Sequence, residues 1–170
     1  VFAQAAALFA QPMAEKTALS IENSLNNRGY AALESESLDP AIAPDVKEAF
    51  NVGRDPEPGE TVDPDAPSVG ANQWPDLPGF RATMLAYYAA LRRLSEKLHE
   101  AFAADLGLAP DYFAASIDRP MATLRVLRYP PHPGAFDGSR YGAGTHTDYG
   151  NITILAQDDV GGLEVRTRSG

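Results

Sequence analysis

The sequence predicts an α+β fold, and the order of its segments is the main reason. Helix-like periodicity dominates up to about residue 106, whereas short strand-like runs follow Pro120. Helices followed by strands favour helices packed on an antiparallel sheet or barrel, because a parallel sheet would need the two to alternate. There is no internal repeat, and 170 residues with 44% hydrophobic content are enough to bury one core.

The first 80 residues are predicted to form short elements and a long loop. Residues 1–10 have the pattern of the end of an amphipathic helix, which Pro12 stops. Residues 15–26 are expected to hold a short helix or a turn. Six prolines between residues 51 and 79 exclude a helix or a central strand there. We therefore expect a surface loop over residues 51–79.

The clearest helix is predicted over residues 80–106, with Gly107 as its stop. Apolar residues recur there at spacings of three and four, which is the pattern of a helix with one buried face. The predicted buried face consists of Met84, Tyr88, Leu91, Leu94, Leu98 and Phe102. The opposite face carries Arg92, Ser95, Glu96 and His99, so His99 is expected on the surface and not as a metal ligand.

Three strands are predicted after Pro120. They cover residues 121–129, 151–157 and 162–167, and the last two are separated by the turn-like residues 158–161. By the period of two, Arg125 and Tyr129 share one face of the first strand, with Thr123 and Leu127. Arg128 lies on the opposite face and is expected to be structural.

Composition and charge narrow the function. The net charge of −9 argues against nucleic acid or an anionic membrane surface as a partner, because phosphate binding needs clustered Lys and Arg. The absence of cysteine excludes disulfides, thiolate ligands and a cysteine nucleophile. No apolar run approaches the roughly 20 residues that span a bilayer.

Residues 144–150 (GTHTDYG) hold the most informative motif of the chain. On an extended backbone, His146 and Asp148 point to the same side, so that an imidazole and a carboxylate can reach one metal ion. These are two of the three groups in the 2-His-1-carboxylate triad of non-haem Fe(II) oxygenases. A turn in which Asp148 caps backbone amides would produce the same triplet. No His follows His146.

The surroundings of this motif favour the metal interpretation. LRVLRYPP precedes it at residues 124–131, and ITILAQDDVGGLEV follows it at residues 152–165. Together these stretches resemble the core of the isopenicillin-N-synthase-like family of Fe(II)/2-oxoglutarate-dependent dioxygenases. The resemblance extends over the earlier part of the chain, in the family's usual order, at residues 9–16, 28–30, 45–50, 72–75 and 77–81.

The resemblance implies a partial double-stranded β-helix, or jelly roll, with helices packed outside it and truncated at both ends. Residues 1–120 would be the helical and loop N-terminal region, and residues 121–170 the first part of the jelly-roll core. His146 and Asp148 would bind Fe(II), and the third ligand, a His, is expected beyond Gly170. The implied cosubstrates are 2-oxoglutarate and O₂. We expect a cytoplasmic location.

Further site residues follow from the strand pattern at residues 121–129 and, for Tyr129, also from the resemblance. Arg125 and Tyr129 would hold a carboxylate of 2-oxoglutarate or of the substrate, since buried polar groups need partners. The alternatives are an internal salt bridge for Arg125 and a structural hydroxyl bond for Tyr129. Tyr149 would orient Asp148 or contact the substrate, unless it is simply exposed. His132 is assigned to a loop, and the candidates for the substrate entrance are Glu34, Glu36 and residues 72–74.

The expected reaction is oxidation of a small organic substrate, hydroxylation by default, with decarboxylation of 2-oxoglutarate to succinate. One alternative is an oxidase of the isopenicillin N synthase type, which needs no 2-oxoglutarate. Another is a non-catalytic homologue that binds an anion. Because the chain begins with Val1 and ends after a predicted strand, we expect it to be a fragment that binds iron weakly and does not turn over.

Overall fold

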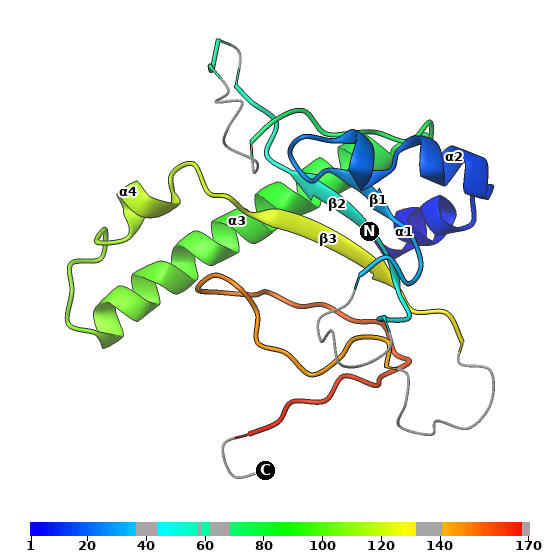
Figure 1. Cartoon of the computed structure of the whole chain (residues 1–170). Coiled ribbons are helices and arrows are strands. Elements are labelled where there is room, and N and C mark those ends of the chain that lie inside the picture. The colour runs from blue at the N-terminus through cyan, green and yellow to red at the C-terminus, as the bar shows by residue number, and fades with distance from the viewer. Residues whose placement is uncertain (37–43, 58, 62–68, 132–140, 168–170) are drawn as a thin grey trace.

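The computed structural model describes residues 1–36, 44–57, 59–61, 69–131 and 141–167. Helices and strands alternate along the chain, with two strands before the long helix, whereas the sequence predicted strands only after Pro120 (Figure 1). The elements are α1 (Phe2–Phe9), α2 (Met13–Ala18), the 3-10 helix η1 (Ile21–Asn23), β1 (Gly29–Ala31), β2 (Glu48–Gly53), α3 (Phe80–Asp105), α4 (Ala114–Ile117) and β3 (Thr123–Arg128).

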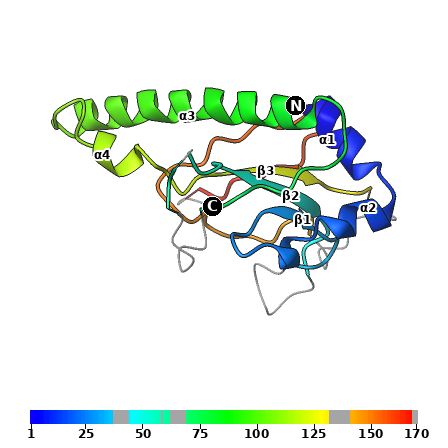
Figure 2. The same ribbon diagram turned by 90° about the horizontal axis from the view of Figure 1, so that it is seen from above.

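The described strands form one antiparallel sheet in the order β1-β2-β3. Phe50 in β2 lies opposite both Tyr30 in β1 and Val126 in β3. Directly opposed residues project from the same face of a sheet, so these three side chains meet on one side. Figure 2 shows α3 running along a face of this sheet.

The core lies between that face and helices α1 and α3. Leu8 and Phe9 of α1 and Phe80 and Met84 of α3 are buried against the sheet residues Tyr30, Phe50, Val52 and Val126. The Phe50 and Phe80 rings meet edge to face at 5.6 Å between centroids. The α+β class, with helices on an antiparallel sheet, is therefore confirmed for the described residues.

Helix α3 confirms the helix predicted over residues 80–106, and Gly107, with φ +68°, follows its end. Part of the predicted face is wrong, because Leu94 and Phe102 are each 45% exposed. His99 is buried at 4% exposure, which corrects its assignment to the surface. Its ring packs edge to face on Phe113, so a tertiary contact overrides the apolar periodicity.

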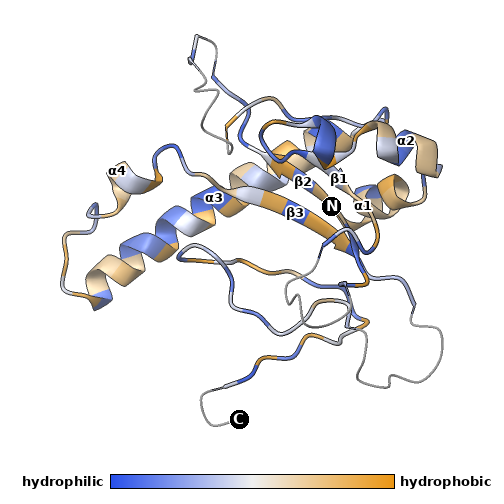
Figure 3. Cartoon of the chain, in the orientation of Figure 1, coloured by the Kyte–Doolittle hydropathy of each residue, from blue (hydrophilic) through white to orange (hydrophobic). Residues whose placement is uncertain are grey.

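The hydropathy of α3 changes along its length. Its middle turns are largely hydrophilic, whereas the end near α1 is more apolar (Figure 3). Among the described residues, no helix combines the length and the apolar character needed to cross a membrane.

Two strands of the first half were not predicted. β2 takes in residues 51–53, so the loop predicted over residues 51–79 begins too early. Every residue of β2 is buried, and a strand covered on both faces shows no alternation of polar and apolar residues. β1 has only three residues, too few to reveal a period.

Of the three strands predicted after Pro120, one is confirmed. β3 lies inside the predicted residues 121–129, but residues 151–157 and 162–167 form no strand in the described part of the chain. A strand is stabilised by the ladder of hydrogen bonds to a neighbour, and no described strand pairs with these segments. Ile152 and Ile154 nevertheless stay half-buried between exposed neighbours, as the alternating pattern predicts.

Candidate metal-binding site

The two candidate ligands lie side by side. His146 Nε2 is 3.2 Å from Asp148 Oδ1, and both side chains are partly exposed to solvent. The spacing of two residues therefore brings an imidazole and a carboxylate together, as expected from the sequence. Within the described residues, no group of three His, Cys, Asp or Glu side chains could hold a metal ion. His132 lies outside the described residues.

Hydrogen bonding sets the tautomer of His146. Its Nδ1 lies 2.7 Å from the carbonyl oxygen of Gly144, which can only accept, so Nδ1 carries the proton. In the neutral ring, Nε2 then presents a lone pair towards Asp148 Oδ1, another acceptor. Two acceptors 3.2 Å apart are a favourable arrangement only with a proton or a cation between them. The donor set fits a divalent metal such as Fe(II), and the carbonyl orients the imidazole from behind.

The segment that carries the pair is attached to the residues before β2. The backbone N–H of Gly144 donates to Asp45 Oδ1 at 2.9 Å, and that of Val46 donates to the carbonyl oxygen of Tyr141 at 3.0 Å. Asp45 also accepts from Lys47 Nζ through Oδ2 at 2.5 Å. Sequence reasoning did not select Asp45 or Lys47. The signal that could have found them was their spacing of two within DVKE, which places both charges on one side of an extended segment.

Arg125 already has a carboxylate partner among the described residues. Its guanidinium group forms an ion pair with Glu36, and both side chains are about one-third exposed. Lys47 Nζ lies 3.7 Å from the same Glu36 carboxylate. This is the internal salt bridge that the sequence left open as the alternative role of Arg125. The binding of an external carboxylate by Arg125 stays a prediction.

The two candidate tyrosines have different surroundings. The Tyr129 ring covers Gly142, where a Cβ would lie only 2.6 Å from Tyr129 Cδ1. Partial burial raises the pKa of Tyr129, against the opposing effect of Arg125. Tyr149 is 99% exposed, so the structure does not bring it against Asp148. Tyr129 thus packs on the segment that leads to the ligand pair, and both functional roles stay predictions.

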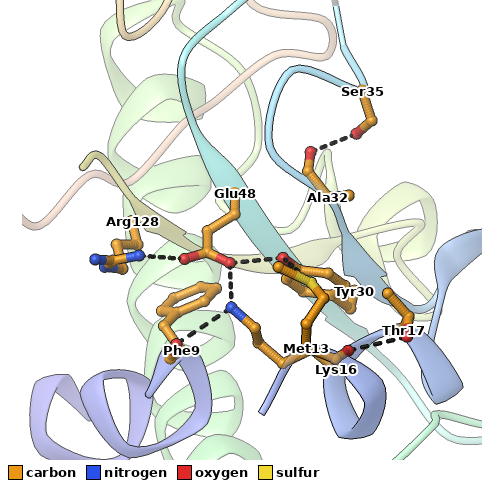
Figure 4. Close-up of polar contacts among 9 residues, drawn as sticks. All are labelled: Phe9, Met13, Lys16, Thr17, Tyr30, Ala32, Ser35, Glu48 and Arg128. Atoms are coloured by element: carbon orange, nitrogen blue, oxygen red, sulfur yellow. Dashed lines mark hydrogen bonds and ion pairs between the residues drawn. The ribbon is translucent and has the colours of Figure 1, made fainter. Parts of the chain in front are cut away.

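A second charged cluster, formed by Glu48, Lys16, Tyr30 and Arg128, is structural (Figure 4). Glu48 accepts hydrogen bonds from Lys16 at 2.8 Å, Tyr30 at 2.6 Å and Arg128 at 2.5 Å. Burial raises the pKa of Glu48, but these three donors outweigh it and the pKa is lowered. The cluster ties α2 to all three strands, in agreement with the structural role expected for Arg128.

Comparison with known proteins identifies the family. A family described as "non-haem dioxygenase in morphine synthesis N-terminal" matches residues 1–77. The 2OG-Fe(II) oxygenase superfamily matches residues 120–170, which contain Arg125, Tyr129, His146 and Asp148. The 2-oxoglutarate-Fe(II) type oxidoreductase hxnY of Emericella nidulans is 36% identical over 92% of this chain. The chain belongs to the isopenicillin-N-synthase-like Fe(II)/2-oxoglutarate oxygenases.

Other members of this oxygenase family agree in sequence and in structure. The 2-oxoglutarate-dependent dioxygenase citB of Monascus ruber is 37% identical over 98% of this chain. A 2OG-Fe(II) oxygenase family protein from Caulobacter crescentus superposes with a TM-score of 0.69 and 31% identity, covering 82% of this chain and 44% of its own. A full-length Neurospora crassa protein in complex with alpha-KG superposes with a TM-score of 0.59 and 31% identity, covering 76% of this chain and 40% of its own.

The chain spans about half the length of the curated oxygenases it matches, 47% of hxnY and 52% of citB.

Proposed function

We propose that this chain supplies two of the three iron ligands of a non-haem Fe(II)- and 2-oxoglutarate-dependent oxygenase that hydroxylates a small organic substrate. The observation that carries the proposal is the pair His146 Nε2 and Asp148 Oδ1, 3.2 Å apart, with the His146 ring oriented by Gly144. Bound iron with 2-oxoglutarate would supply the activation of O₂, coupled to decarboxylation of 2-oxoglutarate to succinate.

The residues of this chain have distinct tasks in the proposal. His146 and Asp148 hold the metal on one side, and a third ligand, expected to be a His beyond Gly170, completes the triad. Three protein ligands on one side leave positions for the cosubstrates. Arg125 and Tyr129 bind a carboxylate of 2-oxoglutarate or of the substrate, and Tyr149 contacts the substrate or Asp148. The core that surrounds them is a jelly roll, of which residues 121–170 form the first part.

Relatives support the choice of cosubstrate and of substrate class. The Neurospora crassa protein was crystallised in complex with alpha-KG and with thymine, a small molecule. The relatives hxnY and citB are named after 2-oxoglutarate. These names favour the 2-oxoglutarate-dependent reaction over the oxidase that needs no 2-oxoglutarate. The proposal includes a cytoplasmic location. It also includes the absence of a nucleic-acid or membrane partner, which the net charge of −9 favours.

The test compares ligand variants in the product of the whole gene. We expect the unmodified protein to bind Fe(II) at one site and to form succinate from 2-oxoglutarate and O₂. His146→Gln and Asp148→Asn should each abolish succinate formation and weaken Co(II) binding, followed by its visible absorption spectrum. The matched control is Asp159→Asn, which removes an exposed carboxylate from the nearby turn and should change neither. Equal Co(II) binding by all four proteins would refute the proposal.

A polypeptide of residues 1–170 alone should bind Fe(II) weakly and should not turn over. Two protein ligands leave most of the coordination sphere to water, and unpaired strand edges invite association. Tight stoichiometric Fe(II) binding with succinate formation by this polypeptide would contradict that expectation.

A further inference from the structure

The carboxylate of Asp45 is buried beside the segment that carries the ligand pair. Its exposure is 2%, and it lies 99 residues before its hydrogen-bond partner Gly144. The backbone N–H of Asp45 donates to the carbonyl oxygen of Glu36 at 3.0 Å, and its own carbonyl oxygen accepts from the backbone N–H of Lys47 at 3.0 Å. The main chain at Asp45 is therefore fixed on both sides.

Lys47 fixes the orientation of the carboxylate itself. Its Nζ is 2.5 Å from Asp45 Oδ2, and both side chains are almost fully buried. The ion pair offsets part of the cost of burying either charge and occupies one carboxylate oxygen. The other oxygen, Oδ1, is left to accept the N–H of Gly144 at 2.9 Å. A hydrogen bond from a backbone N–H to an ionised carboxylate is stronger than one between neutral groups.

Gly144 is held at both of its backbone groups. Its N–H donates to Asp45, and its carbonyl oxygen accepts from His146 Nδ1 at 2.7 Å. A rotation about φ or ψ of Gly144 would break one of these bonds. The orientation of the carbonyl that sets the His146 tautomer thus depends on the carboxylate of Asp45.

We propose that Asp45 is a positioning residue that acts through Gly144 to hold the His146 ring with Nδ1–H on the Gly144 carbonyl and Nε2 on the side of Asp148. The value of this arrangement for metal binding rests on the function proposed above, but the orientation itself is a property of the metal-free protein. Loss of an interaction that orients a metal-binding imidazole from behind typically lowers metal affinity by about 10- to 100-fold.

The test uses Asp45→Ala in the whole-gene product, with three measurements. Long-range ¹H–¹⁵N NMR of the metal-free protein reports the His146 tautomer, hydrogen exchange reports the Gly144 N–H, and Co(II) titration reports metal affinity. We expect the unmodified protein to show a hydrogen-bonded Nδ1–H of His146 and a protected Gly144 amide. In the variant, exchange at Gly144 should be about tenfold faster, the hydrogen bond of His146 Nδ1–H should lose population, and Co(II) binding should weaken about tenfold.

Glu48→Gln is the matched control. It removes a buried negative charge only three residues away, but the hydrogen bonds of Glu48 run to Lys16, Tyr30 and Arg128 and not to Gly144. It should lower stability without changing the His146 tautomer or the exchange of the Gly144 amide. If Asp45→Ala does not fold, Asp45→Asn replaces it, and the same three measurements should change in the same direction. An asparagine can turn its oxygen to Gly144 only by aiming its amide group at Lys47.

Each outcome separates the two proposals. An unchanged tautomer and unchanged Gly144 exchange in the Asp45 variants would overturn the positioning role. A changed tautomer with unchanged Co(II) affinity would overturn its value for the metal. Absence of metal binding in the unmodified protein would overturn the proposed function, and the NMR and exchange data would still decide whether Asp45 orients His146.

Discussion

His99 of helix α3 is hydrogen-bonded to Asn151, three residues after the candidate ligand Asp148. Nε2 of His99 lies 2.8 Å from Nδ2 of Asn151, while Nδ1 lies 2.7 Å from the carbonyl oxygen of Ser95. The Ser95 carbonyl can only accept, so Nδ1 carries the proton and Nε2 accepts from the Asn151 amide. A buried imidazole thus attaches the segment after the ligand pair to the long helix.

We predict measurable coupling between His99 and Asn151. In a double-mutant cycle of His99→Leu and Asn151→Ala, the coupling energy from urea unfolding should be about 1 kcal/mol, the usual value of such a bond. Glu100→Gln, on the exposed side of the same helix, should change the free energy of unfolding by less than about 0.5 kcal/mol. A coupling energy near zero would show that the two side chains stabilise the fold independently.

Glu48→Gln is predicted to destabilise the protein by about 3 kcal/mol at neutral pH, because Lys16 would stay buried without its carboxylate partner. Arg128→Met should cost about 1 kcal/mol or less, since Arg128 is half-exposed and water screens its charge. Urea denaturation of both variants measures the difference. Equal losses would show that the buried and the exposed partner of Glu48 contribute alike.

The pH dependence of the free energy of unfolding should also change in Glu48→Gln. The folded state lowers the pKa of Glu48 below its ordinary value of 4.5, so the unfolded chain takes up a proton first as the pH falls. The stability from this group is fully present above that ordinary value and is lost as the pH falls through the lowered pKa. Urea midpoints measured between neutral pH and about pH 3 should therefore fall less steeply for Glu48→Gln than for the unmodified protein. Parallel curves would contradict the assignment.

Gly29→Ala is predicted to be among the most damaging single substitutions. Gly29 has φ +111°, and a Cβ there would lie 2.2 Å from the backbone oxygen of Leu19. Clash and backbone strain together should cost on the order of 3 kcal/mol. Gly107→Ala is the control, since φ is +68° but the space around it is open, and about 1 kcal/mol of strain is expected. Thermal unfolding compares the two, and similar losses would rule out the clash.

Glu36→Gln should strengthen the binding of 2-oxoglutarate if Arg125 binds one of its carboxylates. Glu36 now occupies the guanidinium group, so removing its charge removes a competitor. We expect affinity to rise about fivefold, the scale of a partly exposed ion pair, and Arg125→Met to lower it. Titration of the Co(II)-loaded protein with 2-oxoglutarate measures both. No change in either variant would leave Arg125 with the structural role of its salt bridge.

Local patterns were enough to predict some parts of the fold and of the site. His146 and Asp148 are two residues apart, so their proximity could be predicted from one short segment. Helix α3 is long enough for its helical period to be recognised from the sequence. Other parts depend on partners that no local pattern shows. The burial of His99 depends on Phe113, and the selection of Asp45 depends on Gly144, 99 residues later.

The strands show the same division. β3 has an exposed and a covered side and could be recognised from its alternation, whereas β2 is covered on both sides and could not. Residues 151–157 and 162–167 carry strand patterns, but a pattern becomes a strand only where a neighbour provides the ladder of hydrogen bonds.

The contact between Asp45 and Gly144 also bears on how members of this family can be recombined. The two matched family regions, residues 1–77 and residues 120–170, meet at this contact, since one supplies the carboxylate and the other the ligand segment. A chimera that joins the first region of one relative to the second region of another would separate residues that orient each other. Exchange between homologues should therefore move residues 36–48 and 141–148 as a single unit, although almost a hundred residues lie between them.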